Sequence, residues 1–182
     1  HIGPAANRNI NMTAIVMDNG VYGLTKGQSS PTTDLGQITT STPFGKIENS
    51  VIPLKNYLTI GVSYIASYYS SKPKILAQYM QEAMNHKGFS IVHVMSPCTT
   101  YNDTYQILKG NPKEGIKGLA YEIPEDYDPT KIDQAQKLVN SPGVPLGLVY
   151  KNEIDTIEER FSFMKEKAKV QSNEEILNSY SI

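Results

Sequence analysis

The sequence contains a single cysteine, and it has no apolar run long enough to span a bilayer. One cysteine excludes a disulfide framework within the chain and a metal site made only of its own thiolates. Lysine and arginine number 17 against 18 aspartates and glutamates, so there is no basic excess to attract nucleic acid or an anionic membrane surface. We therefore expect neither a nucleic-acid partner nor a membrane partner.

The length of 182 residues and the composition, 39% hydrophobic and 19% charged, fit one ordinary domain. The first nine residues, HIGPAANRN, include no initiator methionine and show no basic-then-apolar signal pattern. We expect the natural protein to extend upstream of His1.

Hydrophobic periodicity predicts alternating strands and helices. A buried strand is expected at 12–17 and another at 89–95, with helices over 53–65 and 73–86 and a short strand at 67–69. This order predicts an α/β fold with an open, mostly parallel sheet flanked by helices. Ligands in such sheets bind at the carboxyl ends of strands, and two of these ends carry unusual loops, 18–34 and 96–102.

The second half of the chain has a looser pattern. We expect extended or irregular structure over 110–129, then a helix over 130–139 capped by Thr130. A strand at 145–150 and an amphipathic helix over 154–169 should follow, and the polar tail to residue 182 should be frayed.

The loop from Asp18 to Thr33 has the residues of an anion site. It offers an amide oxygen at a strand end, three glycines, several hydroxyls and one lysine. Glycines let backbone N–H groups approach an anion, and amide and carbonyl oxygens suit Mg²⁺. The residues alone indicate a diphosphate carried on Mg²⁺, and a plain surface loop of turn residues is the alternative.

Three segments carry a resemblance to a known family. They are DNGVYGLTKGQSSPTT preceded by AANRN, GFSIVHVMSPCTTYN, and PLGLVY. Together they resemble, in the same order, the thiamine-diphosphate-binding β subunit of the 2-oxoacid:ferredoxin oxidoreductases. The resemblance covers most of the chain and implies the thiamine-diphosphate-binding fold. It implies that 1–102 form the C-terminal part of the cofactor-binding domain and that 103–182 form an extension packed on it.

The resemblance implies a role for each residue of the first motif. Asn19 would bind Mg²⁺ through its side chain and Val21 through its backbone carbonyl, while Asp18 would cap the turn. A Gly-Asp-Gly turn with another metal ligand is expected upstream of His1. The cofactor-binding residues implied are Asn19, Gly20, Val21, Tyr22, Gly23, Leu24 and Thr25.

Leu24 and Lys26 match positions near the reacting end of the cofactor, which marks them as the candidate catalytic residues. The ammonium of Lys26 suits a substrate carboxylate or a phosphate. A solvated loop lysine is the alternative.

Cys98 follows an apolar strand, where a lone cysteine usually packs as a small hydrophobic residue. The resemblance implies instead that Cys98 is one of four ligands of a [4Fe–4S] cluster, with the other three upstream of His1. A cluster near the cofactor suits electrons that leave one at a time.

The family carries out coenzyme A-dependent oxidative decarboxylation of 2-oxoacids and passes the electrons to ferredoxin. The implied partners are an α subunit, ferredoxin, the 2-oxoacid and coenzyme A, in the cytoplasm. The Leu-Thr-Lys-Gly-Gln form resembles the enzymes that take 2-oxoglutarate or a broad range of 2-oxoacids. The alternatives are a non-redox thiamine-diphosphate decarboxylase or synthase and a non-catalytic scaffold subunit.

Overall fold

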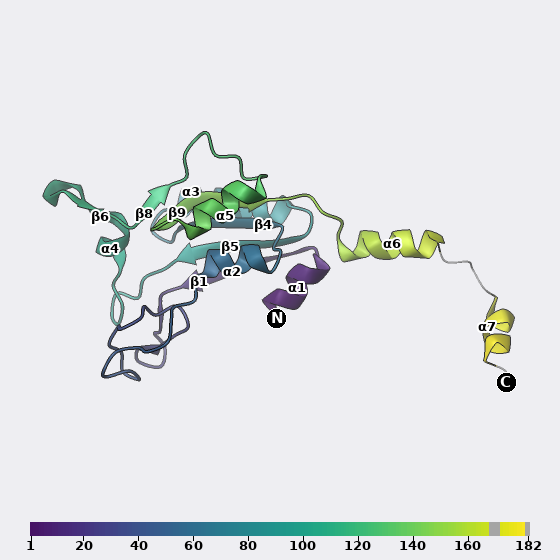
Figure 1. The fold of residues 1–182 in the computed structure, drawn as a ribbon, viewed down its shortest axis with the longest axis horizontal. Helices are drawn as coiled ribbons and strands as arrows, with labels where there is room; N and C mark the ends of the chain where they lie inside the picture. The colour runs from purple at the N-terminus through teal and green to yellow at the C-terminus, as the bar shows by residue number, and fades with distance from the viewer. Residues whose placement is uncertain (168–171, 181–182) are drawn as a thin grey trace.

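A five-stranded sheet forms the centre of the computed structural model, which describes residues 1–167 and 172–180 (Figure 1). The strand order is β1-β5-β4-β9-β8, and all neighbouring strands are parallel except β4 and β9. The predicted α/β fold with a mostly parallel sheet is confirmed. The strands are β1 (Met12–Asp18), β4 (Tyr64–Tyr69), β5 (Phe89–Met95), β8 (Ala120–Glu122) and β9 (Val144–Lys151).

Three helices cover one face of the sheet: α1 (Ile2–Arg8), α2 (Pro53–Thr59) and α5 (Ile132–Asn140). Their apolar side chains pack on alternate strand residues such as Ile65 and Ile91, both fully buried. The expected Thr130 cap is wrong, because α5 has Lys131 at its N-cap and no side-chain capping bond.

The opposite face is covered by α3 (Pro73–Asn85), which matches the predicted helix to within one residue. Ala66 and Val92 pack on this second face, whereas the residues just before them, Ile65 and Ile91, pack on the first. Strands β4 and β5 are buried along their whole length because helices cover both faces, as in other parallel sheets.

The helix predicted over 53–65 is six residues too long. It ends at Thr59, and Gly61 follows in a left-handed conformation with φ 81°. Only glycine adopts such a φ easily, so the chain leaves the helix there. The last two residues of the predicted helix, Tyr64 and Ile65, belong to β4, which is longer than the short strand expected at 67–69.

Strand β1 lies at the edge of the sheet, with β5 as its neighbour. Its burial alternates, and Met17 is 62% exposed. The prediction of a strand here is confirmed, but it is half-buried rather than buried.

Short elements surround the sheet. Residues 110–129, expected to be extended or irregular, include two two-residue strands and a 3-10 turn besides β8. No helix among the described residues is long and apolar enough to cross a membrane. The remaining short elements are β2 (Val21–Tyr22), β3 (Gln28–Ser29), α4 (Tyr105–Lys109), β6 (Gly110–Asn111), η1 (Pro112–Glu114) and β7 (Ile116–Lys117).

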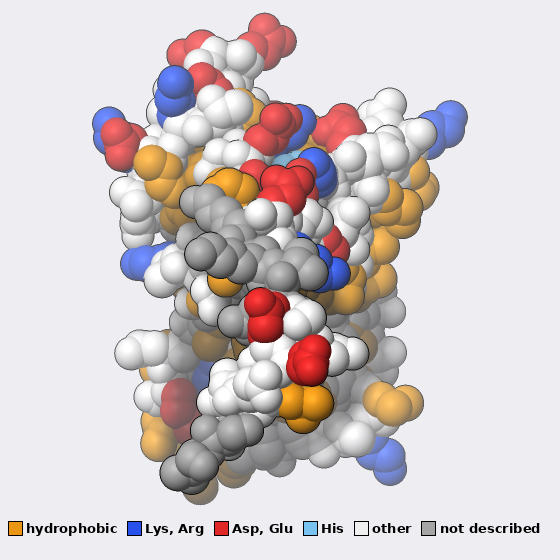
Figure 2. Space-filling model, turned by 90° about the vertical axis from the view of Figure 1, so that its right-hand side faces the viewer, with side chains coloured by type: hydrophobic (Ala, Val, Ile, Leu, Met, Phe, Trp, Pro, Cys, Tyr) orange, Lys and Arg blue, Asp and Glu red, His pale blue; other side chains and the backbone are white. Residues whose placement is uncertain are grey.

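The last two helices, α6 (Ile157–Lys167) and α7 (Asn173–Ser179), extend away from the sheet (Figure 1). The end of the helix predicted over 154–169 lies outside the described residues. The frayed tail is wrong for α7, because Ser172 and Glu175 form a capping box in which each side chain bonds the other's backbone N–H. Acidic and basic side chains are interspersed over this side of the molecule (Figure 2).

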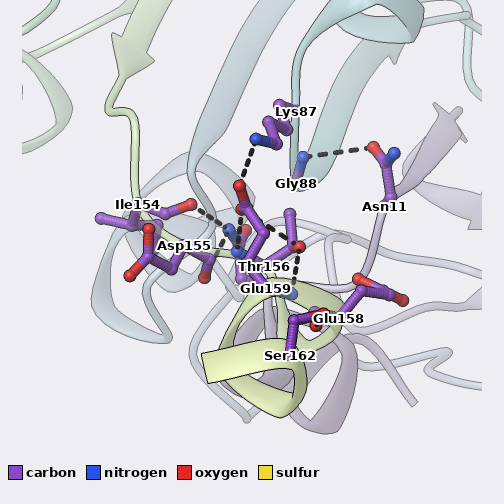
Figure 3. A network of polar contacts seen from close by, with 10 residues as sticks. Asn11, Lys87, Gly88, Ile154, Asp155, Thr156, Glu158, Glu159 and Ser162 are labelled. Carbon is purple, nitrogen blue, oxygen red and sulfur yellow. Dashed lines mark hydrogen bonds and ion pairs between the residues drawn. The ribbon is translucent and has the colours of Figure 1, made fainter. Parts of the chain in front are cut away.

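A polar network joins the start of α6 to the sheet (Figure 3). The buried side chain of Asn9 donates to the carbonyl of Ile154 at 2.9 Å and accepts from the backbone N–H of Phe89 at 2.9 Å. Lys87 forms an ion pair with Glu159 in the first turn of α6. These contacts fix the segment where the chain leaves the sheet.

Candidate functional site

The two loops singled out from the sequence lie side by side. Strands β1 and β5 are parallel neighbours whose register pairs Asp18 with Met95, so their carboxyl ends coincide. The backbone N–H of Ser96 donates to the carbonyl of Asp18 at 2.8 Å. The sheet therefore places the loop after Asp18 against the loop containing Cys98.

Asp18 organises the first loop. One of its carboxylate oxygens, Oδ1, accepts hydrogen bonds from the backbone N–H of Gly20 at 2.9 Å and from the Thr32 hydroxyl at 2.7 Å. The prediction that Asp18 caps this turn is confirmed. Thr32 was not predicted to take part, because it lies 14 positions from Asp18 and no local motif links the two residues.

Asn19 lies just after the end of β1, and both its side-chain and its backbone oxygen accept hydrogen bonds. Its side-chain Oδ1 accepts from the backbone N–H of Val21 at 3.1 Å, and its carbonyl accepts from the side-chain amide of Asn102 at 2.9 Å. Gly20 has φ 69°, and a Cβ there would lie 2.7 Å from the Asn102 amide nitrogen. Glycine is therefore required at position 20 both by its backbone conformation and by this close approach.

The rest of the motif forms a small hairpin. Strands β2 and β3 pair, and Gly23 to Gly27 make the tip, closed by a hydrogen bond from the Gly27 N–H to the carbonyl of Tyr22 at 2.9 Å. Leu24, at 99% exposure, and the exposed Lys26 lie on this tip. Lys26 has φ 78°, a conformation that non-glycine residues rarely adopt.

The hairpin is also held by side chains. The Thr25 hydroxyl donates to the side-chain carbonyl of Gln28 at 2.6 Å, whereas Tyr22 is 53% exposed. The ring of Tyr101 lies so close to Gly27 that a Cβ there would be 2.9 Å from a ring carbon. The loop after β5 thus packs directly on the hairpin.

Gly23 brings the two candidate ligand residues together. A Cβ built on Gly23 would lie 3.3 Å from the Asn19 amide nitrogen and 3.4 Å from the Cys98 sulfur. Cys98 is a free, half-buried thiol, and its carbonyl accepts the backbone N–H of Asn102 at 2.8 Å. The predicted Mg²⁺ ligand and the predicted cluster ligand therefore flank one glycine, although they are 79 positions apart in the sequence.

A buried histidine lies behind this turn. The Nε2 atom of His93 is 3.6 Å from the other carboxylate oxygen of Asp18, and its Nδ1 atom is 3.4 Å from the Tyr57 hydroxyl. Burial lowers the pKa of His93, and the Asp18 carboxylate acts against that shift. Burial together with Asp18 raises the pKa of Tyr57 to about 12. His93 is therefore a core residue with polar partners.

A cavity of about 300 Å³ opens beside these loops. Asn19, Gly20 and Asn102 contribute polar groups to its wall, and Ile52 and Leu119 are among its apolar lining. The site thus combines hydrogen-bonding groups with apolar surface, which is usual for a site that binds a small organic molecule.

The described residues supply some of the ligands that Mg²⁺ and a [4Fe–4S] cluster would need. An amide oxygen and backbone carbonyls at a glycine-rich turn are donors that Mg²⁺ prefers, and the absence of a side chain at Gly23 lets Asn19 and Cys98 approach each other closely. Among the described residues, no group of three or more His, Cys, Asp and Glu side chains could hold a metal. Cys98 supplies one thiolate, and an iron–sulfur cluster held by four cysteines needs three more from outside these 182 residues.

The sequence did not assign roles to Asn102 or Thr33. Asn102 was part of the second motif, and the only signal for its role was an amide placed at the end of a neighbouring parallel strand. Thr33 is 1% exposed and donates its hydroxyl to the carbonyl of Gly20 at 2.5 Å.

Two known families match the chain. Residues 1–94 match the thiamine pyrophosphate enzyme C-terminal TPP binding domain, and residues 98–166 match the C-terminal part of the pyruvate ferredoxin oxidoreductase β subunit. A 2-oxoacid:ferredoxin oxidoreductase subunit β of Saccharolobus solfataricus is 34% identical over 176 residues, which cover 89% of this chain and 56% of that protein. The 2-oxoglutarate synthase subunit KorB of Methanocaldococcus jannaschii is 35% identical over 119 residues, 65% of this chain and 44% of that protein.

A solved structure matches the whole chain. It is a 2-oxoglutarate:ferredoxin oxidoreductase from Magnetococcus marinus with 2-oxoglutarate, coenzyme A and succinyl-CoA bound. The match has a TM-score of 0.86 and 35% sequence identity, and it covers 100% of this chain and 62% of that one. The chain spans about half the length of the curated relatives that it matches.

Proposed function

Because the chain belongs to the thiamine-pyrophosphate-binding β subunits of the 2-oxoacid:ferredoxin oxidoreductases, we propose that it holds Mg²⁺-thiamine diphosphate for the coenzyme A-dependent oxidative decarboxylation of a 2-oxoacid. The observation that carries this proposal is the position of Gly23, which is flanked by the side chains of Asn19 and Cys98. Thiamine diphosphate held through Asn19 and an iron–sulfur cluster bound by Cys98 would therefore be close neighbours.

Thiamine diphosphate, when bound, supplies the carbon nucleophile for decarboxylation of the 2-oxoacid. In our proposal, Asn19 and the carbonyl of Val21 hold the Mg²⁺. The diphosphate would lie against the backbone of the turn at Gly23, where no side chain stands between the chain and the cofactor. Tyr22, Leu24 and Thr25 complete the cofactor-binding segment.

The hairpin tip faces solvent where a substrate could approach. Lys26 is exposed, so its ammonium is free to meet a carboxylate of the 2-oxoacid or a phosphate of coenzyme A. The 2-oxoglutarate and coenzyme A in the Magnetococcus structure support these two classes of substrate, with 2-oxoglutarate or a broad range of 2-oxoacids as the acid. Leu24 is an exposed apolar side chain at the same tip, suited to contact the organic part of the cofactor or substrate.

Cys98 is proposed as one ligand of a [4Fe–4S] cluster. Its half-buried thiol lies on the loop that touches the cofactor turn, and the short path would favour transfer of single electrons to the cluster and on to ferredoxin. The names of the relatives support ferredoxin as the acceptor and an α subunit as the partner that completes the enzyme. A free thiol and a cluster suit the reducing cytoplasm.

Assay of the full-length subunit assembled with its partner subunit tests this function. We expect release of carbon dioxide from 2-oxoglutarate, coupled to coenzyme A consumption and ferredoxin reduction, and dependent on added Mg²⁺-thiamine diphosphate. Decarboxylation without reduction of ferredoxin would instead identify a non-redox decarboxylase. Absence of cofactor binding by the assembled complex would identify a scaffold subunit.

A further inference from the structure

A buried lysine lies beneath the cofactor loop without an acidic partner. Lys46 is only 5% exposed, and its ammonium donates to three backbone carbonyls: those of Ser30 at 3.1 Å, Pro31 at 3.1 Å and Thr33 at 2.7 Å. No carboxylate of the described residues lies within ion-pair distance of it. The charge is therefore held by carbonyl oxygens alone.

The three carbonyls compensate for the burial of the Lys46 ammonium. Burying an ammonium is costly unless its hydrogens find partners, and its three donors match the three carbonyls. Rings of backbone carbonyls also hold K⁺ in other proteins, where the carbonyl oxygens replace the water around the ion. The Lys46 ammonium thus acts on this turn as a monovalent cation that is attached to the chain.

The turn held by Lys46 reaches the proposed metal site through one residue. Thr33 offers its carbonyl to Lys46 and to the Ser50 hydroxyl at 2.7 Å. Its own hydroxyl donates to the carbonyl of Gly20 and accepts from the N–H of Ser30 at 2.7 Å. Gly20 directly follows Asn19, so Thr33 links the 30–33 turn to the Asn19–Gly20 turn.

We propose that Lys46 is a positioning residue whose tethered ammonium holds the 30–33 turn and, through the Thr33 hydroxyl, fixes the Asn19–Gly20 turn before the cofactor arrives. The effect on the cofactor rests on the proposed function, whereas the effect on the turn does not. A turn fixed in advance loses less conformational entropy on binding, so affinity for the cofactor should depend on Lys46.

Amide hydrogen exchange in the full-length subunit within its natural complex, without thiamine diphosphate, is the first measurement. Lys46→Ala should speed exchange in the 20–33 segment about tenfold or more, because the carbonyls lose their shared partner. Lys46→Met, which keeps the stem and removes the charge, should do the same. Lys55→Ala, an exposed lysine on α2, is the matched control and should leave exchange unchanged.

Chemical rescue separates a cation role from simple packing. Propylammonium replaces the atoms that Lys46→Ala removes, so it should restore slow exchange in that variant. It should not do so in Lys46→Met, where the stem fills the space. Tetramethylammonium carries the same charge without N–H donors and should rescue neither. The proposal would be overturned if exchange in both Lys46 variants equalled that in Lys55→Ala. It would also be overturned if propylammonium and tetramethylammonium rescued Lys46→Ala equally.

Titration with Mg²⁺-thiamine diphosphate then tests the link to the cofactor. Lys46→Ala should weaken binding about tenfold, with recovery in propylammonium. Faster exchange with unchanged affinity would overturn that link. A wild-type complex that binds no cofactor would defeat the proposed function, while the exchange data would still decide the role of Lys46.

Discussion

The side-chain amide of Asn102 donates a hydrogen bond to the backbone carbonyl of Asn19 across 2.9 Å. The same amide accepts from Gln37 at 3.0 Å, and the backbone N–H of Asn102 bonds the carbonyl of Cys98. One residue therefore joins the turn proposed to hold Mg²⁺ to the loop proposed to hold the cluster. The parallel strands β1 and β5 bring these loops together, and the Asn102 side chain adds a direct bond between them.

Replacing Asn102 by alanine should loosen that connection. The change removes two side-chain hydrogen bonds, each worth about 1 kcal/mol, and leaves the Asn19 carbonyl without its partner. We expect cofactor affinity in the complete complex to fall roughly tenfold. Titration of thiamine diphosphate, with Asn56→Ala on the exposed side of α2 as control, measures it. Affinity equal to that of the control would show that Asn102 does not position the turn.

Replacing Asn19 by alanine should have the larger effect. It removes a proposed Mg²⁺ ligand as well as the bond from the Val21 N–H, and a lost ligand to a small octahedral cation should cost roughly a hundredfold in affinity. The fold should survive because the position lies in a partly exposed turn. The same titration decides it, and unfolding curves show whether the variant remains folded. Unchanged affinity would leave Asn19 only a turn-forming residue.

Replacing Cys98 by serine should separate the two halves of the reaction. Serine keeps the shape but is a poorer iron ligand than a thiolate, so the cluster should be lost or labile and ferredoxin reduction should stop. Slow release of carbon dioxide should persist, because decarboxylation needs no cluster. Iron content and the low-temperature paramagnetic spectrum of the reduced complex are the measurements. Wild-type iron with an unchanged spectrum would make Cys98 a packing residue.

His86 should make the fold less stable in mild acid. It is buried, and its Nε2 atom lies 3.0 Å from the Ser63 hydroxyl. Burial lowers the pKa of His86 most, the Lys151 charge lowers it further, and the Glu153 charge opposes this shift. The unfolded chain takes up the proton near pH 6.5, before the folded protein does. The free energy of unfolding should therefore decrease as pH falls below about 6.5, by at most about 1.4 kcal/mol per pH unit.

His86→Gln keeps a hydrogen-bonding side chain and removes the charge change, so its unfolding free energy should depend less on pH. Denaturant unfolding of both proteins at pH 7.5 and 5.5 gives the comparison. His93 contributes to both proteins alike, so the difference between their slopes reports His86. Equal slopes would contradict the assignment. His86 follows α3 in an extended conformation and is buried.

Local patterns predicted part of the molecule well. The apolar run that forms β5 and the periodic segment that forms α3 were predicted to within a residue, because each is long and bounded by proline or glycine. The helix expected over 53–65 merged a helix with the start of a buried strand, since both are apolar. The tail was expected to fray, yet Ser172 and Glu175 cap α7 with a local motif that can be found in the sequence.

The sequence by itself determined the chemistry that this protein can use: an amide and glycines after one strand, a lone thiol after another, and the family that such motifs mark. Only the tertiary structure decided that these groups meet at Gly23 and that Asn102 and Thr33 hold the turn between them. It also decided that Lys46 lies buried beneath, since no periodicity marks a loop lysine as internal. The reason is physical: residue type and spacing fix what a segment can form, whereas contacts between distant segments depend on which strands pair and how their ends align.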